Sequence, residues 1–197
     1  VEATRWSAKS THADVPTDCP TRERHGWTGD AQIFCNTASY LFNFAPFARK
    51  YVHDMLDGQR KNGKFRQITP KGGVDFYMDF MDGSAGWSDA GVLIPYRIYK
   101  RYGDQKILEN SYAAMKQYAD FKIKTLGRWY PTAVRTGIDR KYRKYISNYG
   151  QSYGEWAEPT EVHITGFQDF ACPHPEETTA YIVYLLETMA EIAEVLG

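Results

Sequence analysis

The residues best suited to chemistry gather in one short segment near the start of the chain, TDCPTRERHGWTGD. Within thirteen positions it holds three carboxylates, an arginine and a tryptophan: Asp18, Arg22, Glu23, Trp27 and Asp30. Cleavage of a glycosidic bond needs a carboxylic acid that keeps its proton near neutral pH, and nearby carboxylates raise each other's pKa because like charges resist ionising together. An arginine can bind sugar hydroxyls or hold a carboxylate, and an indole offers a flat face to a sugar ring. The segment therefore favours glycoside cleavage.

The same segment also has a structural interpretation. Asp30 can cap the helix predicted after it, and charged residues in a loop most often form solvated Asp–Arg pairs. Gly26 and Gly29 permit turns that a Cβ would hinder. The five histidines have no metal-ligand spacing, and the three cysteines form no CxxC pair. The sequence therefore predicts no metal site, no cofactor and no disulfide framework.

The stretch DCPTRERHGWTGDAQ (residues 18–32) resembles the catalytic-domain signature of bacterial α-L-rhamnosidases, glycoside hydrolase family 78. The resemblance continues at DGSAGWSDA (82–90), which Pro95, Tyr99 and the YGD of 102–104 follow, and it returns at YGEW (153–156) and over 178–197. These anchors keep the order of the family and roughly its spacing, and they span nearly the whole chain. The resemblance implies an (α/α)6 barrel that hydrolyses terminal α-L-rhamnose with inversion.

The resemblance also implies a role for each matching residue. Glu23 corresponds to the general acid, and Asp18 and Asp30 correspond to carboxylates that line the rhamnose pocket. Four further residues correspond to substrate-binding positions, with the last two as aromatic walls: Arg22, Trp27, Trp87 and Trp156.

Three features depart from the family pattern. The family often has one more residue between its first aspartate and the acid, so the RER form here makes Glu23 the best candidate for the acid. The later motif commonly contains GDW, whereas this chain has GEW with Glu155. An inverting mechanism also needs a second carboxylate, the base, about 6.5–9.5 Å from the acid. In the family this base is a later glutamate, beyond Gly197, and no pattern favours Glu155 or Glu158 in its place.

Helical periodicity supplies the elements that must position these residues. It predicts two successive helices over 30–56, separated near Pro46 and ended by Gly58, because proline interrupts a helix. Further helices are predicted over 89–102, with Gly103 as its C-terminal cap, over 104–125, with Asp104 as its N-terminal cap, and over 176–196. The stretches 65–86 and 127–172 are predicted to be loops.

Length and composition limit the class of protein. The chain has 197 residues, 24 basic and 24 acidic, so its formal net charge is zero, which argues against nucleic acid and against a polybasic membrane contact. No window approaches the roughly 20 apolar residues of a membrane span. Aromatic residues make up 15% of the chain, which fits a protein that stacks on sugars. The predicted partner is a carbohydrate, a rhamnoside.

Five or six helices are about half of the twelve in an (α/α)6 barrel. The sequence therefore predicts an all-α fold in which residues 1–197 form the N-terminal part of an incomplete barrel of antiparallel helix pairs. Two alternatives stay open: an inert fragment or sugar-binding helical module, and another (α/α)-barrel hydrolase or lyase. Exposed helix faces would then favour self-association. The start at Val1, without Met or a signal-peptide pattern, suggests a fragment or processed form and leaves the compartment open.

Overall fold

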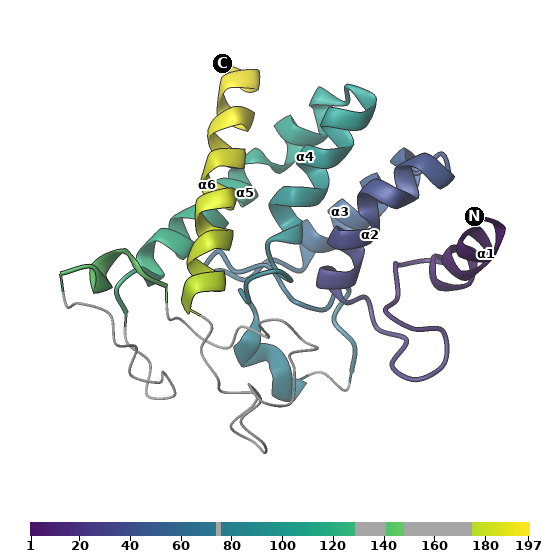
Figure 1. The fold of residues 1–197 in the computed structure, drawn as a ribbon, viewed down its shortest axis with the longest axis horizontal. Coiled ribbons are helices and arrows are strands. Elements are labelled where there is room, and N and C mark those ends of the chain that lie inside the picture. Colours follow the sequence, from purple (N-terminus) through teal and green to yellow (C-terminus); the bar gives the residue numbers. More distant parts are fainter. Residues whose placement is uncertain (74–75, 129–140, 148–174) are drawn as a thin grey trace.

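A computed structural model describes residues 1–73, 76–128, 141–147 and 175–197 of the chain. Within these ranges the chain forms six α-helices and two short 3₁₀ helices and no strand (Figure 1): α1 (Glu2–Thr11), α2 (Thr28–Leu41), α3 (Ala45–Asp57), η1 (Phe76–Met81), α4 (Ala90–Tyr102), α5 (Gln105–Thr125), η2 (Arg143–Tyr145) and α6 (Pro175–Leu196). The prediction of an all-α fold is confirmed.

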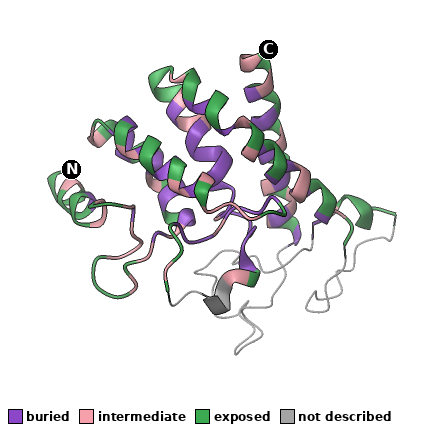
Figure 2. Ribbon diagram, turned by 180° about the vertical axis from the view of Figure 1, so that it is seen from behind, coloured by how far each residue is buried: buried purple, intermediate pink, exposed green. Residues whose placement is uncertain are grey.

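Helix α4 lies at the centre of the molecule and packs against α2, α3, α5 and α6. Its apolar residues Val92, Leu93 and Ile98 are almost completely buried. Only Gly103 and Asp104 separate α4 from α5, so the chain reverses there, and the left-handed Gly103 (φ 70°) donates its N–H to Tyr99 O as predicted. Figure 2 shows the buried residues on the faces that these helices turn toward one another. The apolar faces that periodicity predicts therefore pack five of the six described helices, α2 to α6, against one another.

Helix α1 is the one that the sequence did not predict, and it stands apart from the other helices in Figure 1. Ala8 is its only buried residue, so it has no apolar stripe that periodicity could detect. The contact that holds it lies just beyond its end, where the His12 ring lies 5.3 Å from the Phe47 ring. Phe34 and Phe44 also contact this ring, and burial lowers the pKa of His12. Helix α1 is thus held by aromatic packing of one histidine.

Two predicted helix caps differ from the observed ones. Helix α2 begins at Thr28 rather than at Asp30, which lies within the first turn, so Asp30 does not cap the helix. Asp104 occupies the position before α5 but makes no cap hydrogen bond, and it accepts a hydrogen bond from Arg49 Nε at 2.7 Å instead. In both places a tertiary contact replaces the local one that the sequence suggested.

A short strap, residues 67–69, runs beside the segment that precedes α2. Thr28 N donates to Gln67 O at 2.9 Å, and Thr69 N donates to Gly26 O at 2.8 Å. Gly26 is required here because a Cβ at this position would lie 2.0 Å from Thr69 O. The predicted loop over 65–86 therefore contains this strap and the 3₁₀ helix η1, and it is fixed to the start of α2.

Several large apolar side chains remain exposed on the helices, among them Trp6, Ile33, Tyr40 and Val183. They lie on α1, α2 and α6. The self-association expected from such faces stays a prediction. No helix within the described ranges is long and apolar enough to span a bilayer.

Candidate active site

The acidic segment, residues 18–30, forms a closed turn that leads into α2. Asp18 N donates to His25 O at 3.1 Å, and Asp18 Oδ1 accepts the N–H of His25, also at 3.1 Å. Arg24 adopts a left-handed conformation (φ 55°) that completes the turn. The two ends of the turn are thus locked together, which places Asp18 close to the start of α2.

Glu23 makes the most specific contacts of the segment. Trp27 Nε1 donates to Glu23 Oε2 at 2.7 Å, and Arg22 Nη2 donates to Glu23 Oε1 at 2.5 Å. The Glu23 side chain is 34% exposed, whereas that of Arg22 is 82% exposed. Each carboxylate oxygen therefore has one nitrogen donor, one held by a partly buried indole and the other by a side chain in solvent.

Asp30 completes the cluster of three carboxylates. Partial desolvation of its carboxyl group raises the pKa of Asp30 above the ordinary value of 3.8, although the residue as a whole stays exposed, and the charges of Asp18 and Glu23 raise this pKa further. Asp18 and Asp30 also line a hollow of about 360 Å³ between α1 and α2, together with His12 and Phe34. The fold thus brings together the three carboxylates that the sequence singled out.

Trp87 lies beside the first turn of α2. A Cβ on Gly29 would lie 2.7 Å from Trp87 Nε1, so the indole rests directly on this glycine. Gln32 Nε2 donates to Gly86 O at 3.1 Å and ties the same loop to α2. Trp87 therefore lies against the first turn of α2, the turn that also carries Asp30. Trp156, like Glu155 and Glu158, lies outside the described residues.

Two buried aspartates support the loop that carries Trp87, and neither was predicted to have a role. Asp89 is fully buried, and its carboxylate accepts hydrogen bonds from Gly86 N at 2.7 Å and from Tyr118 Oη at 2.8 Å. Lys122 Nζ lies 3.9 Å from Asp89 and donates to Gly83 O at 3.1 Å. Burial lowers the pKa of Lys122.

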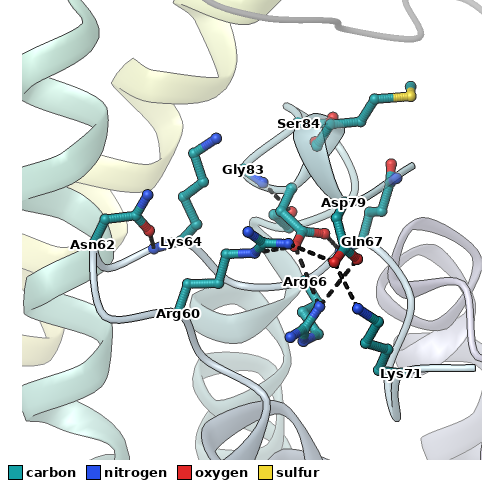
Figure 3. Close-up of polar contacts among 12 residues, drawn as sticks. Arg60, Asn62, Lys64, Arg66, Gln67, Lys71, Asp79, Gly83 and Ser84 are labelled. Atoms are coloured by element: carbon teal, nitrogen blue, oxygen red, sulfur yellow. Dashed lines mark hydrogen bonds and ion pairs between the residues drawn. The ribbon is translucent and has the colours of Figure 1, made fainter. Parts of the chain in front are cut away.

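The second buried aspartate is Asp82, which belongs to a charged cluster under the strap. Arg60 Nε donates to Asp82 Oδ2 at 2.5 Å, and Gln67 N donates to Asp82 Oδ1 at 3.1 Å. Figure 3 shows the side chains of Arg60, Arg66 and Lys71 directed toward Asp79, the other acid of the cluster. Asp82 begins the second motif, DGSAGWSDA, and Asp89 is the last acid of that motif. The motif could therefore have pointed to these two aspartates, but it does not reveal the contacts that they make.

The described residues include no group of three His, Cys, Asp or Glu side chains that could hold a metal ion. Cys19 and Cys35 are free, and burial raises the pKa of Cys35 to about 11. What the site can offer is acid–base chemistry by carboxylates and stacking by tryptophans.

Comparison with known proteins identifies a related family. The model of the bacterial alpha-L-rhamnosidase six-hairpin glycosidase domain matches residues 1–197. An alpha-L-rhamnosidase of Streptomyces avermitilis is 28% identical over 193 residues, which are 98% of this chain and 16% of that protein. One from Alteromonas sp. is 34% identical over an alignment of 157 positions that covers 71% of this chain and 16% of that protein.

Solved structures show the same relationship. An alpha-L-rhamnosidase from Dictyoglumus thermophilum superposes with a TM-score of 0.75 at 30% identity, over 98% of this chain and 19% of that one. The Streptomyces avermitilis enzyme complexed with L-rhamnose superposes with a TM-score of 0.72 at 27% identity, over 100% of this chain and 17% of that one. The chain thus spans less than a fifth of each of these relatives.

Proposed function

The chain belongs to the bacterial α-L-rhamnosidase six-hairpin glycosidase family, and from this premise we propose that it supplies the general acid of an inverting α-L-rhamnosidase. Glu23 is the acid that protonates the glycosidic oxygen as the bond to the anomeric carbon breaks. Its contacts with Trp27 and Arg22 are the observation that carries the proposal, because they fix the direction of the carboxyl group. A solved relative complexed with L-rhamnose supports a sugar ligand.

Glu23 must hold a proton before it can donate one. Each of its oxygens accepts an N–H, so the oxygen that takes the proton is the one whose donor can leave when the substrate enters. The exposed guanidinium of Arg22 is able to turn toward the hydroxyls of the sugar, while the Trp27 indole stays in place. In this scheme Arg22 leaves Glu23 and binds the substrate. The oxygen that Arg22 releases, Glu23 Oε1, then carries the proton.

Asp18 and Asp30 bind the sugar rather than transfer its proton. Hydroxyl groups are good donors to carboxylates, and such charge-assisted bonds are strong when water is excluded. Both side chains line one hollow, and the charges of Asp18 and Glu23 both act on Asp30. Trp27 and Trp87 flank the start of α2, where they can cover the apolar face of a deoxy sugar. Trp156 is proposed as a further wall on the resemblance alone.

The second carboxylate of an inverting mechanism activates the attacking water from the opposite face of the sugar. We assign this base to a part of the protein outside residues 1–197. The chain spans only 16–19% of the length of its curated relatives, which leaves most of their sequence to supply such a group.

The substitution Glu23→Gln in the full-length protein tests the role of the acid. The glutamine side chain can still accept the Trp27 N–H, so the expected result is a loss of about 10²–10⁴-fold in kcat on an alkyl α-L-rhamnoside. The loss is expected to be much smaller on a nitrophenyl rhamnoside, because that leaving group needs little protonation. Glu2→Gln, at an exposed pair on α1, is the matched control. Turnover near the wild-type level with both substrates would remove the assignment.

The alternative is a sugar-binding module or inert fragment, and the small share of each relative that the chain covers favours it for residues 1–197 alone. Calorimetry with L-rhamnose beside a turnover assay separates the two functions. Binding without turnover by these residues is expected, and turnover by them would contradict the placement of the base elsewhere.

A further inference from the structure

We propose that Asp82 is a positioning residue for the acid Glu23, acting through Gln67 and the start of α2. Asp82 lies outside the acidic segment and contacts none of its residues in the hydrogen bonds described above. The inference rests on the proposed function of Glu23. It adds a residue that neither touches the substrate nor takes part in proton transfer, and it explains why a charged cluster lies under the strap.

The first link joins Asp82 to the strap. Asp82 is 3% exposed, and its Oδ1 accepts the backbone N–H of Gln67 at 3.1 Å. Its other oxygen, Oδ2, accepts from Arg60 Nε at 2.5 Å, and Arg66 Nη1 lies 3.6 Å away. Because a buried carboxylate is stable only when it is paired, both oxygens of Asp82 have defined directions. The position of Gln67 is therefore fixed by a rigid acceptor.

The second link joins the strap to α2. The Gln67 carbonyl accepts the N–H of Thr28 at 2.9 Å and the Thr28 hydroxyl at 3.0 Å. The first N–H groups of a helix have no partner inside the helix, and the residue before α2, Trp27, provides no side-chain cap. Gln67 thus supplies the acceptor that a capping residue would normally supply, and its place decides where α2 starts.

The third link joins the start of α2 to the acid. Trp27 directly precedes Thr28 and pairs with Ile68 of the strap in an isolated β-bridge. Its indole donates to Glu23 Oε2 at 2.7 Å. A shift of the strap therefore moves Trp27, and with it the group that fixes the direction of the Glu23 carboxyl. An error of about 1 Å at a reacting group can cost about 100-fold in rate.

Asp79 offers a matched comparison within the same cluster. It forms three ion pairs, with Arg60 at 3.0 Å, Arg66 at 3.2 Å and Lys71 at 2.6 Å. Partial burial raises the pKa of Asp79, but these three cations together lower it more, so the pKa lies below its ordinary value. None of these contacts reaches the backbone of the strap. Loss of Asp79 therefore removes more ion pairs than loss of Asp82 does, but it leaves the Gln67 N–H with its acceptor.

The test compares Asp82→Ala with Asp79→Ala in the full-length protein on an alkyl α-L-rhamnoside and, beside it, on a nitrophenyl rhamnoside. Asp82→Ala is expected to lower kcat about tenfold or more. This loss is expected on the alkyl rhamnoside and to be much smaller on the nitrophenyl rhamnoside, because only the alkyl leaving group depends on a well-placed acid. Asp79→Ala is expected to lower the melting temperature while kcat on both substrates stays unchanged. Asp82→Asn, which can still accept the Gln67 N–H, is expected to restore most of kcat.

Three outcomes would overturn the inference: an equal loss of kcat on both substrates, or no loss on either, in folded Asp82→Ala; an equal loss on the alkyl rhamnoside in Asp79→Ala; or no recovery in Asp82→Asn. If Asp82→Ala does not fold, Thr28→Val provides the second variant, since it removes the hydroxyl that donates to the carbonyls of Gln67 and Arg66 and leaves every charged side chain of the cluster in place. It is then expected to lower kcat on the alkyl rhamnoside more than on the nitrophenyl rhamnoside, and wild-type kcat on the alkyl rhamnoside would contradict the inference. Full activity in Glu23→Gln would instead remove the proposed function, so the two failures are distinct.

Discussion

Asp30 and Asp89 occupy similar places at the start of two helices, yet their surroundings are opposite. Asp30 lies three residues after Trp27 in the first turn of α2, and Asp89 lies two residues after Trp87 directly before α4. Asp30 is exposed as a residue, and partial desolvation of its carboxyl group together with two neighbouring acids raises its pKa. Asp89 is fully buried, and its oxygens accept from a backbone N–H and a tyrosine hydroxyl.

The difference shows how one residue type serves two tasks. A carboxylate that must bind or protonate a substrate has to face solvent, and its charge is then poorly satisfied until the substrate arrives. A carboxylate that holds a loop is withdrawn from water and satisfied by the protein alone. The acidic segment is therefore expected to govern activity, whereas Asp82 and Asp89 are expected to govern geometry and stability.

The largest effect on stability is expected from Asp89→Ala. It leaves Lys122 buried without its carboxylate and Tyr118 without its acceptor, which is expected to cost about 3–5 kcal/mol of the free energy of unfolding. Urea unfolding followed by circular dichroism measures the loss. Tyr118→Phe, which removes only the hydroxyl, is the milder variant and is expected to cost about 1 kcal/mol.

The double variant Asp89→Ala with Lys122→Met sharpens this prediction. Since it removes the unpaired charge together with its partner, it is expected to recover part of the stability that Asp89→Ala loses. Two results would contradict the prediction: Asp89→Ala as stable as the wild type, or a double variant that loses more stability than the two single changes together. Either would show that the buried pair does not stabilise the loop.

An intermediate effect is expected from Gly26→Ala, at the contact that joins the two regions. The new Cβ would lie 2.0 Å from Thr69 O, so the strap and the acidic segment must separate. Overpacking of this kind costs about 1–3 kcal/mol, and here it is also expected to lower kcat. Gly73→Ala, where no atom lies within 4 Å of the new Cβ, is the control. Equal activities of the two variants would mean that the strap does not position the acid.

The sequence was sufficient for most of the helices because their information is local. Periodic apolar residues predicted α3 to α6 closely, and the α4–α5 turn followed from Gly103. Helix α1 could not be found in this way, since its fold depends on the packing of His12 against aromatic rings from elsewhere in the chain. The start of α2 was missed for the same reason, because its cap is the carbonyl of Gln67.

The candidate site divides in the same manner. The three carboxylates were predicted from their crowding within one segment, and the fold does place them together. The family resemblance singled out Trp87 as an aromatic wall, but its place beside Gly29 was not predicted, since no spacing joins residues that are far apart in sequence. Gln67 carried no signal of its role, because what matters is its backbone N–H and carbonyl, which every residue type but proline has.

The smallest effect on stability is expected from Asp30→Asn, and it has the opposite sign to that of Asp89→Ala. Partial desolvation and neighbouring acids raise the pKa of Asp30 in the folded state. The folded protein therefore holds the proton of Asp30 more tightly than the unfolded chain does. Wild-type stability therefore falls as pH rises from about 4, the unfolded pKa, through the folded one. The neutral asparagine escapes this loss, so the variant is expected to match the wild type near pH 3 and to exceed it at pH 7. Solvent screening keeps the gain below about 1 kcal/mol.

Unfolding midpoints of both proteins from pH 3 to pH 7 measure this difference directly. A gain in stability at pH 7 that accompanies a loss of turnover is the expected pattern of an acid kept for function at the expense of the fold. If Asp30→Asn were instead less stable at every pH, Asp30 would be a structural acid like Asp89, and the contrast between the two helix starts would be wrong. Asp89→Asn supplies the reference for that case, since its buried partners are expected to make it less stable at pH 7.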